Sequence, residues 1–471
     1  MELILIPLVA ALATLFLENK LAPKIALAAS VVQLLVTVGW LLGFQLDGSM
    51  QHLTDLVWIN SLGFHFKIGV DGLGLLLVLL TNLMVPLIVL SGFGKTWAGK
   101  SSLFYGLLLL MQMSLVGVFM ALDGLLFYIF WELALIPIYL ICGIWGGENR
   151  IKITFKFFIY TFVGSLLMLL GLIYVYLQTA TRSFDIEALK AVTLTPQASS
   201  YVLWAFFAAF AIKMPVFPLH TWQPSTYTNA PAQGTMLLAG IMLKMGIFGA
   251  IRWMMPLAPE AFVQSQPIFV WLSIIGVVYA AVIAIQQTDL KRLVAYSSIS
   301  HVGLIAAGVF TNSNDGLQGA AIQMLAHAIN VVGLFFVIDI IETKTGTRSL
   351  SQLGGMAKNA PKLAILFFII VLGSTAVPLT NGFVGEFFLL KSIFTYNAWA
   401  GAVAGLTVIF CAVYMLRMYG LAMFGNAAST QTQTMNNQLT WYETTALYII
   451  VALILICGVF PQAIINIIRV A

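Results

Sequence analysis

Acidic and basic side chains interrupt some of the most apolar stretches of this 471-residue chain. Six of them lie within such a stretch or at its edge: Glu132, Lys213, Lys244, Lys291, His327 and Glu386. A charged side chain at the centre of a bilayer costs about 2.5–3.5 kcal/mol on insertion scales, so such groups are usually paired, hydrated or part of an ion path. The pattern therefore predicts a route for ions through an apolar protein.

Glu132 and Lys213 are the two residues that we expect to act together. Glu132 lies about ten residues from either end of its apolar run, too far for its short side chain to reach water. A carboxylate and an ammonium can hold or release a proton according to the distance between them. Lysine suits this role because its protonation state changes readily on burial, unlike that of arginine. A static buried ion pair is the alternative.

Lys244 also lies in the middle of an apolar run, far from its end near Trp253. Snorkelling to the membrane surface is the alternative, but a lysine stem reaches only a turn or two. Gly240, Gly246 and Gly249 surround this lysine in the sequence and permit close approach of a neighbouring helix. We therefore expect the Lys244 ammonium to stay inside the protein.

The segment that begins with Asp289, Lys291 and Arg292 holds further candidates. These three residues are as well explained as anchors at the inner edge of the membrane, although Lys291 has the length to reach inward. His301 and His327 lie deeper, and histidine titrates near neutral pH, which suits a proton relay. Hydrogen-bonded core histidines are the competing interpretation. Neighbouring hydroxyl groups provide places for water between these groups: Tyr296, Ser297, Ser298 and Ser300.

Glu386 follows a stretch of glycine, proline and asparagine within a long apolar run. Lys391 comes five residues later and so lies on another face of a helix. We expect Glu386 to be the point at which protons enter or leave the polar route.

The composition determines what kind of protein must position these groups. Hydrophobic residues make up 61% of the chain and charged residues 8%, far below the roughly 25% charge of soluble domains. Apolar runs of about 20 residues recur, each long enough to cross a bilayer as a helix. The runs lack the alternation of barrel strands. We predict an all-α polytopic membrane protein with about fourteen transmembrane helices: 2–17, 23–45, 70–93, 101–121, 124–143, 153–178, 201–222, 232–254, 267–286, 293–311, 317–341, 362–390, 400–424 and 442–466.

Two of these helices should be broken in a matching way. Pro215 and Pro218 follow Lys213 in the seventh helix, and proline removes a backbone donor and clashes with the preceding turn. Gly373, Pro378 and other helix-breaking residues precede Glu386 in the twelfth. Broken, charge-bearing helices in two halves indicate an ion site near the midplane of a transporter-like fold. Simple proline kinks are the alternative.

The odd offset between the two broken helices indicates inverted repeats, formed by helices 4–8 and helices 9–13. We predict one membrane domain, 1–471, since no segment resembles a soluble domain. Within it the predicted parts are 1–100 with the first three helices, 101–254 as first repeat, 267–424 as second repeat and 442–466 as a C-terminal helix.

The distribution of basic residues predicts the orientation. If the N-terminus lies outside, most lysines and arginines fall in inner loops, as the positive-inside rule requires. Both termini then lie on the outer side. The net charge of +5 follows from this bias and does not indicate nucleic-acid binding. The first helix has Glu2 in place of a basic leader, so we expect it to be retained and not cleaved.

The polar segments and cysteines carry weaker signals. The 46–69 segment has hairpin-like alternation before Asp71-Gly72, but we prefer a loop there, as for 342–361. The segments 180–199 and 425–441 are the other long polar stretches. Cys142, Cys411 and Cys457 lack CxxC spacing, so we expect small buried hydrophobic residues and no metal or cluster site. With no nucleotide loop or haem motif either, the chain should hold no redox cofactor itself.

Several segments together resemble the antiporter-like membrane subunits of respiratory complex I, a family shared with cation/proton antiporters and membrane-bound hydrogenases. They are GVDGLGLLLVLLT, FYIFWELALIPIYLICGIWGG, AIKMPVFPLHTWQPSTYTNAP, LAGIMLKMGIFGAIRW, TDLKRLVAYSSISHVG and NGFVGEFFLLK. The resemblance covers nearly the whole chain. A glutamate at Glu386 is similar to the M-type branch, whereas L- and N-type subunits and antiporter subunits have lysine there.

The resemblance implies fourteen helices in two inverted five-helix repeats and a role for each buried charge. Glu132 and Lys213 would form the central pair, Lys244 would bridge to the second half, and Glu386 would end the channel. His301 and His327 would be additional residues of the polar axis, and Lys291 stays a further candidate from the sequence itself.

The function implied is that of a proton-translocating membrane-arm subunit of NADH:quinone oxidoreductase in the bacterial inner membrane. NADH, FMN, iron–sulfur clusters and quinone would belong to partner subunits, and the neighbouring antiporter-like subunits L and N would be direct partners alongside membrane lipids. The alternatives are a subunit of an Mrp-type Na⁺/H⁺ antiporter or of a membrane-bound hydrogenase, and a spacer that only joins other subunits.

Overall fold

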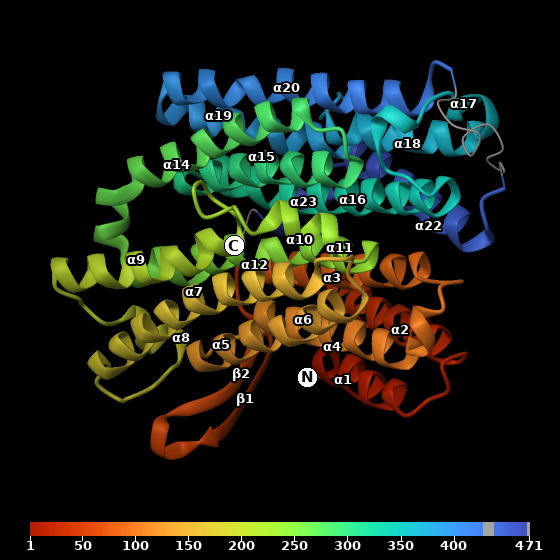
Figure 1. Cartoon of the computed structure of the whole chain (residues 1–471). Helices are drawn as coiled ribbons and strands as arrows, with labels where there is room; N and C mark the ends of the chain where they lie inside the picture. Colours follow the sequence, from red (N-terminus) through yellow and green to blue (C-terminus); the bar gives the residue numbers. More distant parts are fainter. Residues whose placement is uncertain (427–437, 469–471) are drawn as a thin grey trace. The chain divides into compact units, whose positions relative to one another are not determined.

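The computed structural model describes residues 1–426 and 438–468, and nearly all of its regular structure is α-helical. The described chain separates into two compact units. Among the described residues, unit 1 comprises 1–214, 241–268 and 466–468, and unit 2 comprises 215–240, 269–426 and 438–465. Figure 1 shows the course of the helices with their labels.

Unit 1 contains one strand pair and a set of long helices. Its elements are α1 (Glu2–Leu15), α2 (Ala22–Leu42), β1 (Gln51–Ile59), β2 (Phe64–Val70), α3 (Gly72–Ser91), α4 (Ser101–Met120), α5 (Gly124–Leu133), α6 (Leu135–Trp145), α7 (Arg150–Gln178), α8 (Ile186–Lys190), α9 (Pro196–Lys213), α12 (Leu243–Gly249), α13 (Met255–Leu257) and the first part of α14 (Pro259–Gln286). The most extensive contacts are those of α7 with α9 and of α1 with α4.

The named elements of unit 2 are all helices. Its elements are α10 (Gln223–Asn229), α11 (Ala232–Leu237), the rest of α14, α15 (Leu290–Phe310), α16 (Asn314–Thr345), α17 (Met356–Asn359), α18 (Pro361–Ser374), α19 (Asn381–Tyr396), α20 (Ala398–Met423), α22 (Trp441–Val459) and most of α23 (Gln462–Ile468). Helix α16 packs on α15 and α19, so three helices that carry predicted site residues meet.

Short polar side chains start many of these helices. Asp123 accepts hydrogen bonds from the first turn of α5, Asp289 from that of α15, and Asn397 from that of α20. Such caps satisfy backbone N–H groups that have no partner within the helix. Thr440 and Glu443 form a capping box at the start of α22. These four helices therefore begin where the sequence supplies a cap between apolar runs.

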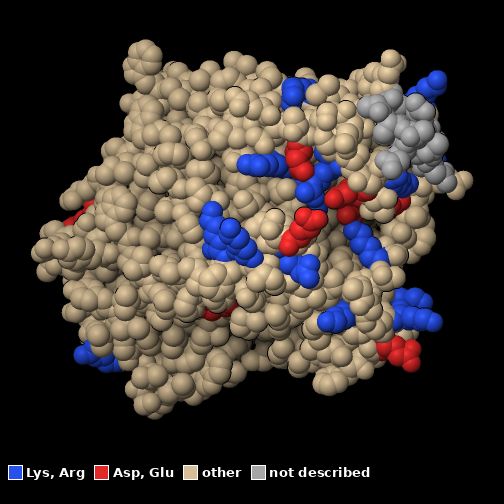
Figure 2. Space-filling model, in the orientation of Figure 1, with Lys and Arg blue, Asp and Glu red and all other residues tan. Residues whose placement is uncertain are grey.

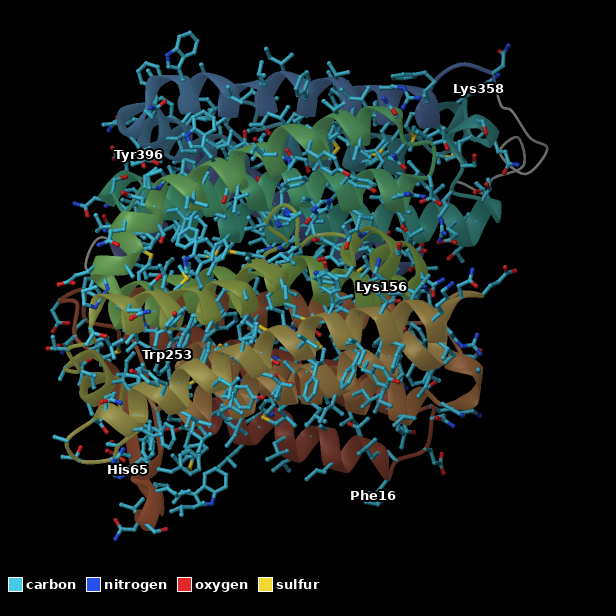
Figure 3. The ribbon with its side chains drawn as sticks, turned by 60° about the vertical axis from the view of Figure 1, so that its left-hand side comes forward. Phe16, His65, Lys156, Trp253, Lys358 and Tyr396 are labelled. Carbon is cyan, nitrogen blue, oxygen red and sulfur yellow. The ribbon has the colours of Figure 1, made fainter. Side chains whose placement is uncertain are left out.

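Eleven helices of the described chain are long and apolar enough to cross a membrane, and the apolar helices α1 and α18 are shorter. On the face drawn in Figure 2, charged side chains are sparse and lie mostly toward the right-hand part of the view. Large side chains divide between the interior and the periphery. Trp253 is fully buried among the helices, whereas Phe16 is 89% exposed (Figure 3). Exposed apolar side chains of this kind are expected where helices face lipid or other subunits.

Both predicted helix breaks are present. Helix α9 ends at Lys213, directly before the two prolines, and the next helix begins at Gln223. In unit 2, α18 ends at Ser374 and α19 begins at Asn381. Between them Ala376 and Leu379 have φ values of 51° and 74°, which non-glycine residues rarely adopt. Each break therefore leaves backbone groups outside a helix next to a residue of the predicted site.

The preference for a loop over residues 46–69 was wrong. Strands β1 and β2 form an antiparallel pair, with Leu56 opposite Phe66. The Trp58 and Phe64 rings stack with centroids 5.0 Å apart, which adds a cross-strand contact that favours strands over a loop. Of the other long polar segments, 180–199 contains the short helix α8 and 342–361 contains α17. Residues 427–437 of the predicted 425–441 loop lie outside the described residues.

Candidate functional site

The predicted site residues form two groups, one in each unit. Unit 1 contains Glu132, Lys213 and Lys244, and unit 2 contains Lys291, His301, His327 and Glu386. Lys213, Lys244, Lys291, His301, His327 and Glu386 are all buried. Glu132 is partly buried, and its Oε1 atom is inaccessible to solvent.

In unit 1, Glu132 and Lys213 lie close enough to interact electrostatically. No hydrogen-bond partner of Glu132 Oε1 or of Lys213 Nζ is found among the described residues. The Lys213 ammonium instead faces aromatic rings, with Nζ 5.5 Å from the centroid of Trp131 and 6.0 Å from that of Phe157. Both distances are within the range of cation–π attraction. Trp131 precedes Glu132 in the chain, so the same turn of α5 provides both the acid and the aromatic face.

Three helices position this pair. Glu132 lies near the end of α5, Lys213 ends α9, and Ser165 on α7 interacts with the Glu132 carboxyl group. The extensive packing of α7 against α9 holds the last two helices together. The sequence placed Glu132 and Lys213 near one another, but it gave no sign of Ser165 or of the aromatic contacts.

Lys244 is fully buried on α12. Two π-helical segments, Leu238–Met242 and Ala250–Met254, flank α12, and neither was predicted. Segments of this kind are often found at functional sites. A Cβ atom at Gly246 would lie 2.8 Å from the carbonyl oxygen of Phe210 and 3.2 Å from Cβ of Lys213. The expectation of close helix approach at this glycine is therefore confirmed, and it brings α12 against the end of α9.

In unit 2, His301 and Glu386 are in contact. His301 Nδ1 lies 3.0 Å from Glu386 Oε1, an ion-pair distance without the alignment of a hydrogen bond. Gln323 Nε2 donates to the same carboxylate oxygen at 3.3 Å. These residues come from α15, α19 and α16, the three helices that pack together. Gln323 was not predicted, because its partner Glu386 is 63 positions away in the chain.

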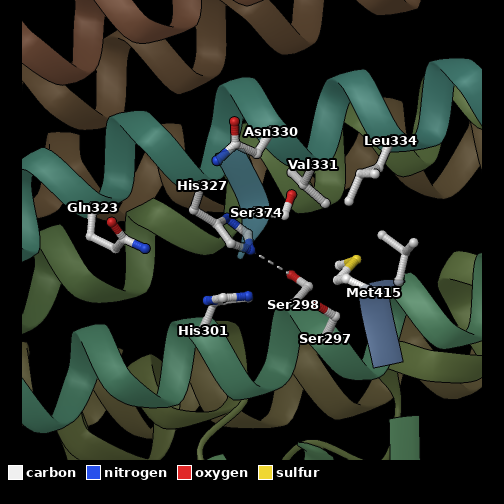
Figure 4. A pocket seen from close by; sticks show the side chains of 11 residues that line it. Ser297, Ser298, His301, Gln323, His327, Asn330, Val331, Leu334, Ser374 and Met415 are labelled. Atoms are coloured by element: carbon white, nitrogen blue, oxygen red, sulfur yellow. Dashed lines mark hydrogen bonds between the residues drawn. The ribbon is translucent and has the colours of Figure 1, made fainter. Parts of the chain in front are cut away.

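His301 and His327 line a common cavity, shown in Figure 4. Their ring centroids are 6.0 Å apart, and His327 Nε2 is hydrogen-bonded to Ser298 Oγ at 3.1 Å. The volume open to the centre of a water molecule is about 20 Å³, which is room for about one water. Other polar lining residues are Ser297, Gln323, Asn330 and Ser374.

The cavity walls contain polar atoms that need partners. Gln323 Oε1, Asn330 Oδ1 and Ser374 Oγ are buried without a hydrogen-bond partner among the described residues. Leaving such groups unsatisfied costs about 1–3 kcal/mol each, so a site of this kind favours water. Of the predicted hydroxyl groups, Ser297 bonds to Tyr414 and Ser300 donates to a backbone carbonyl of α14.

Lys291 links the buried part of unit 2 to its surface. Its Nζ lies 3.5 Å from Glu342 Oε2 and donates to the carbonyl oxygen of Ala230 at 3.4 Å. Arg348 bonds to Glu342 at 3.2 Å and to Asp289 at 2.5 Å. Lys291 is therefore not only a surface anchor, since its ammonium group is buried while its carboxylate partner is partly exposed.

Cys411 departs from the expectation of a simple buried hydrophobic residue. Its sulfur lies 3.5 Å from His301 Nε2 and donates to the carbonyl oxygen of Ser374 at 3.3 Å. No group of three or more potential metal ligands occurs among the described residues. The two groups of site residues, one in each unit, thus contain carboxylate, ammonium and imidazole side chains, which are chemically able to transfer protons.

Comparisons with known proteins agree with this chemistry. Residues 121–412 match a family described as NADH:quinone oxidoreductase/Mrp antiporter, transmembrane. The chain is 36% identical to NADH-quinone oxidoreductase subunit M of Rickettsia prowazekii, over 98% of this chain and 96% of the relative.

Two solved structures have the same fold. A chain of respiratory complex I from Thermus thermophilus superimposes with a TM-score of 0.91 and 31% identity, covering 99% of this chain and 98% of that one. A chain of the Mrp complex from Dietzia sp. gives a TM-score of 0.86 with 19% identity, covering 99% of this chain and 51% of that one. At 19% identity, the similarity to the Mrp chain concerns the fold alone.

Proposed function

Because the chain belongs to the family of membrane subunits common to NADH:quinone oxidoreductases and Mrp antiporters, and is a proton-translocating membrane-arm subunit of complex I, we propose that its buried acids and bases carry the protons. The observation that supports the complex I assignment best is similarity to subunit M over nearly the full length of both chains. The Mrp likeness covers only half of the other chain at lower identity. The chain itself takes part in an NADH:quinone oxidoreductase without binding the redox centres.

In unit 1 the proton-holding pair is Glu132 and Lys213. The ammonium has two competing partners, the carboxylate and the Trp131 face, and both attract a cation. When Lys213 moves toward Glu132, the ionised carboxylate is stabilised, and when it moves toward the ring, the carboxyl group can take up a proton. Lys244, on the helix packed against the end of α9, receives the next proton and passes it toward the second half of the chain.

In unit 2 the route contains Lys291, His327, His301 and Glu386. Glu342 is the surface carboxylate that exchanges protons with Lys291. We propose that a water molecule joins the two rings in the cavity that His327 and His301 line, which has room for about one. Glu386 ends the route, because its carboxylate contacts His301 next to the broken backbone before α19.

The finer architecture follows the same proposal. The chain forms one membrane domain, 1–471, with fourteen helices, two inverted repeats in helices 4–8 and 9–13, and both termini on the outer side of the bacterial inner membrane. The direct neighbours are the antiporter-like subunits L and N. Partner subunits hold NADH, FMN, iron–sulfur clusters and quinone.

The test is proton pumping by the assembled complex in sealed vesicles. We expect Glu132→Gln and Lys213→Met to reduce the protons moved per NADH oxidised severely, because neither variant can exchange a proton at the pair. Glu148→Gln and Lys152→Met replace exposed charges of the same unit and are the matched controls. An unchanged proton-to-electron ratio in either site variant would contradict the assigned pair and support a spacer role.

Purification distinguishes the antiporter alternative. A complex I subunit should co-purify with NADH-oxidising flavin and iron–sulfur subunits. If the purified chain lacks these partners and still exchanges cations for protons, it would instead be an Mrp-type antiporter subunit.

A further inference from the structure

Cys411 on α20 has an unusual setting for a cysteine in an apolar helix. Its sulfur lies 3.5 Å from His301 Nε2 and 3.3 Å from the Ser374 carbonyl oxygen, and the Tyr414 side chain also interacts with it. Cys411 is 2% exposed and His301 is 5% exposed, so both contacts are shielded from solvent. Three helices, α15, α18 and α20, supply these groups.

The available hydrogens determine the direction of each contact. A thiol has one hydrogen to donate, and the Ser374 carbonyl can only accept. The thiol hydrogen therefore goes to Ser374, and the sulfur lone pair faces the histidine. If the thiol instead donated to Nε2, the sulfur and the carbonyl oxygen would meet with no hydrogen between them. His301 Nε2 thus keeps its own hydrogen and donates it to sulfur.

This arrangement leaves Nδ1 as the nitrogen that exchanges a proton. Nδ1 lies 3.0 Å from Glu386 Oε1, while Gln323 donates to the same oxygen. The tautomer of a histidine is set by the hydrogen bond that its other nitrogen makes. A neutral His301 with hydrogen on Nδ1 would face sulfur with a bare Nε2, and the contact with Cys411 would be lost.

We propose that Cys411 is a positioning residue that holds the hydrogen of His301 on Nε2, so that proton exchange occurs only at Nδ1, toward Glu386. The step is a transfer of one proton: the N–H bond at Nδ1 breaks, an O–H bond at Oε1 forms, and an imidazolium–carboxylate pair becomes neutral imidazole and carboxylic acid. The reverse step restores the pair. The inference rests on the proposed function, because it refines the proton route through unit 2.

Among the described residues, His301 is faced by Glu386 from α19, Cys411 from α20, and His327 and Gln323 from α16. Tyr414, also on α20, interacts with Cys411 and Ser297. Among the described residues that line the cavity, only the two histidines titrate. A change in the pH profile on altering Cys411 can therefore be traced to the His301–Glu386 pair or to His327.

The test compares Cys411→Ala with Cys411→Ser in the whole complex. Serine keeps a donor for Ser374 and an acceptor for Nε2–H, so we expect near-normal pumping and an unchanged pH profile. Alanine removes both, and we expect pumping to fall about tenfold, the equivalent of one net hydrogen bond. We also expect a shifted pH profile in Cys411→Ala. Cys457→Ala, on α22 and away from the cavity, is the matched control.

Infrared spectroscopy gives a second readout that does not depend on turnover. We expect the S–H band of Cys411, identified by its loss in Cys411→Ser, to persist across the pH range in the bonded position. Loss of that band on titration would mean that the thiol itself exchanges the proton and would overturn the proposal. An alanine variant with normal pumping and pH profile would also overturn it.

Glu386→Gln distinguishes a failure of the proposed route through unit 2 from a failure of the role of Cys411 alone. If this variant pumps normally, the proposed route through unit 2 fails. If it loses pumping while Cys411→Ala does not, only the role of Cys411 fails.

Discussion

The ammonium nitrogen of Lys213 lies 5.5 Å from the centroid of the Trp131 ring, and Trp131 is the residue before Glu132. Glu132 and Trp131 both attract the Lys213 ammonium, and both lie on one helix, α5. They therefore move together. An indole face is the strongest aromatic partner for a cation, and the attraction is worth about 2 kcal/mol when both groups are desolvated. The relationship gives Lys213 a defined resting place apart from the carboxylate.

Replacing Trp131 by leucine should favour direct pairing of Lys213 with Glu132. We expect the number of protons moved per NADH oxidised to fall roughly three- to tenfold, because a permanent ion pair holds the carboxylate in its ionised form. Trp131→Phe should lose less, since phenylalanine keeps a weaker face. Pumping and NADH oxidation are measured together in vesicles.

Trp204→Leu is the control for this change. Trp204 is partly exposed on α9 in the same unit and has no contact with Lys213 among the described cation–π pairs. Equal losses in both variants would show that the aromatic face has no specific role.

Glu342 provides a second prediction, concerning access to Lys291. We expect Glu342→Gln to slow proton uptake in the complex, because the amide keeps the size of the side chain but cannot bind and release a proton. The measurement is the initial rate of pumping as a function of pH on the uptake side.

Asp289→Asn is the matched control for Glu342→Gln. Asp289 bonds to Arg348 in the same charge network and would keep its cap on α15 as asparagine. If Asp289→Asn slows uptake as much as Glu342→Gln does, the network serves stability and not proton access.

Gly246 provides a third prediction, about the packing that brings Lys244 near the end of α9. An alanine Cβ would lie 2.8 Å from a backbone oxygen and 3.0 Å from a backbone nitrogen, so α12 must shift. Overpacking of this kind costs about 1–3 kcal/mol. We expect Gly246→Ala to lower both the melting temperature of the complex and its pumping ratio.

The control is Gly39→Ala, in α2, where an added Cβ meets nothing within 4 Å. Alanine at an unobstructed helix position stabilises by up to about 1 kcal/mol relative to glycine. A Gly246→Ala complex with normal stability and pumping would show that close approach of α12 to α9 is not required.

The sequence predicted the features that depend on local chain chemistry. Proline and glycine placed both helix breaks, at Lys213 and before Asn381, and the long apolar runs placed the helices. Contacts between distant segments were not predictable, because periodicity identifies a helix face but not its neighbour. Cys411 and His301, which are 110 positions apart, are an example. A loop was preferred over the β-hairpin because the alternation is short and the side chains of β1 are largely exposed, so the signal for burial was weak.

Asp123 provides a prediction about pH, since it lies before the membrane span that begins at Gly124. Burial raises the pKa of Asp123 to about 6, although its carboxylate accepts hydrogen bonds from the backbone of Leu125, Leu126 and His65. The folded chain therefore holds a proton between about pH 4 and 6 that the unfolded chain releases. The free energy of unfolding falls as pH rises through this window, by at most about 3 kcal/mol, and the loss is complete above it.

Asp123→Asn removes this titration, so the melting temperature of the variant relative to the natural protein should rise from pH 4 to 6 and then level off. Asp47→Asn tests the sign. Hydrogen bonds from Ser49 hold the pKa of the exposed Asp47 below its usual value, so this carboxylate contributes fully to the folded state above about pH 4 and loses that contribution as pH falls below it. The stability of Asp47→Asn relative to the natural protein should therefore change in the opposite direction. A melting-temperature difference for Asp123→Asn that is flat from pH 4 to 7 would mean that this carboxyl group ionises normally in spite of its burial.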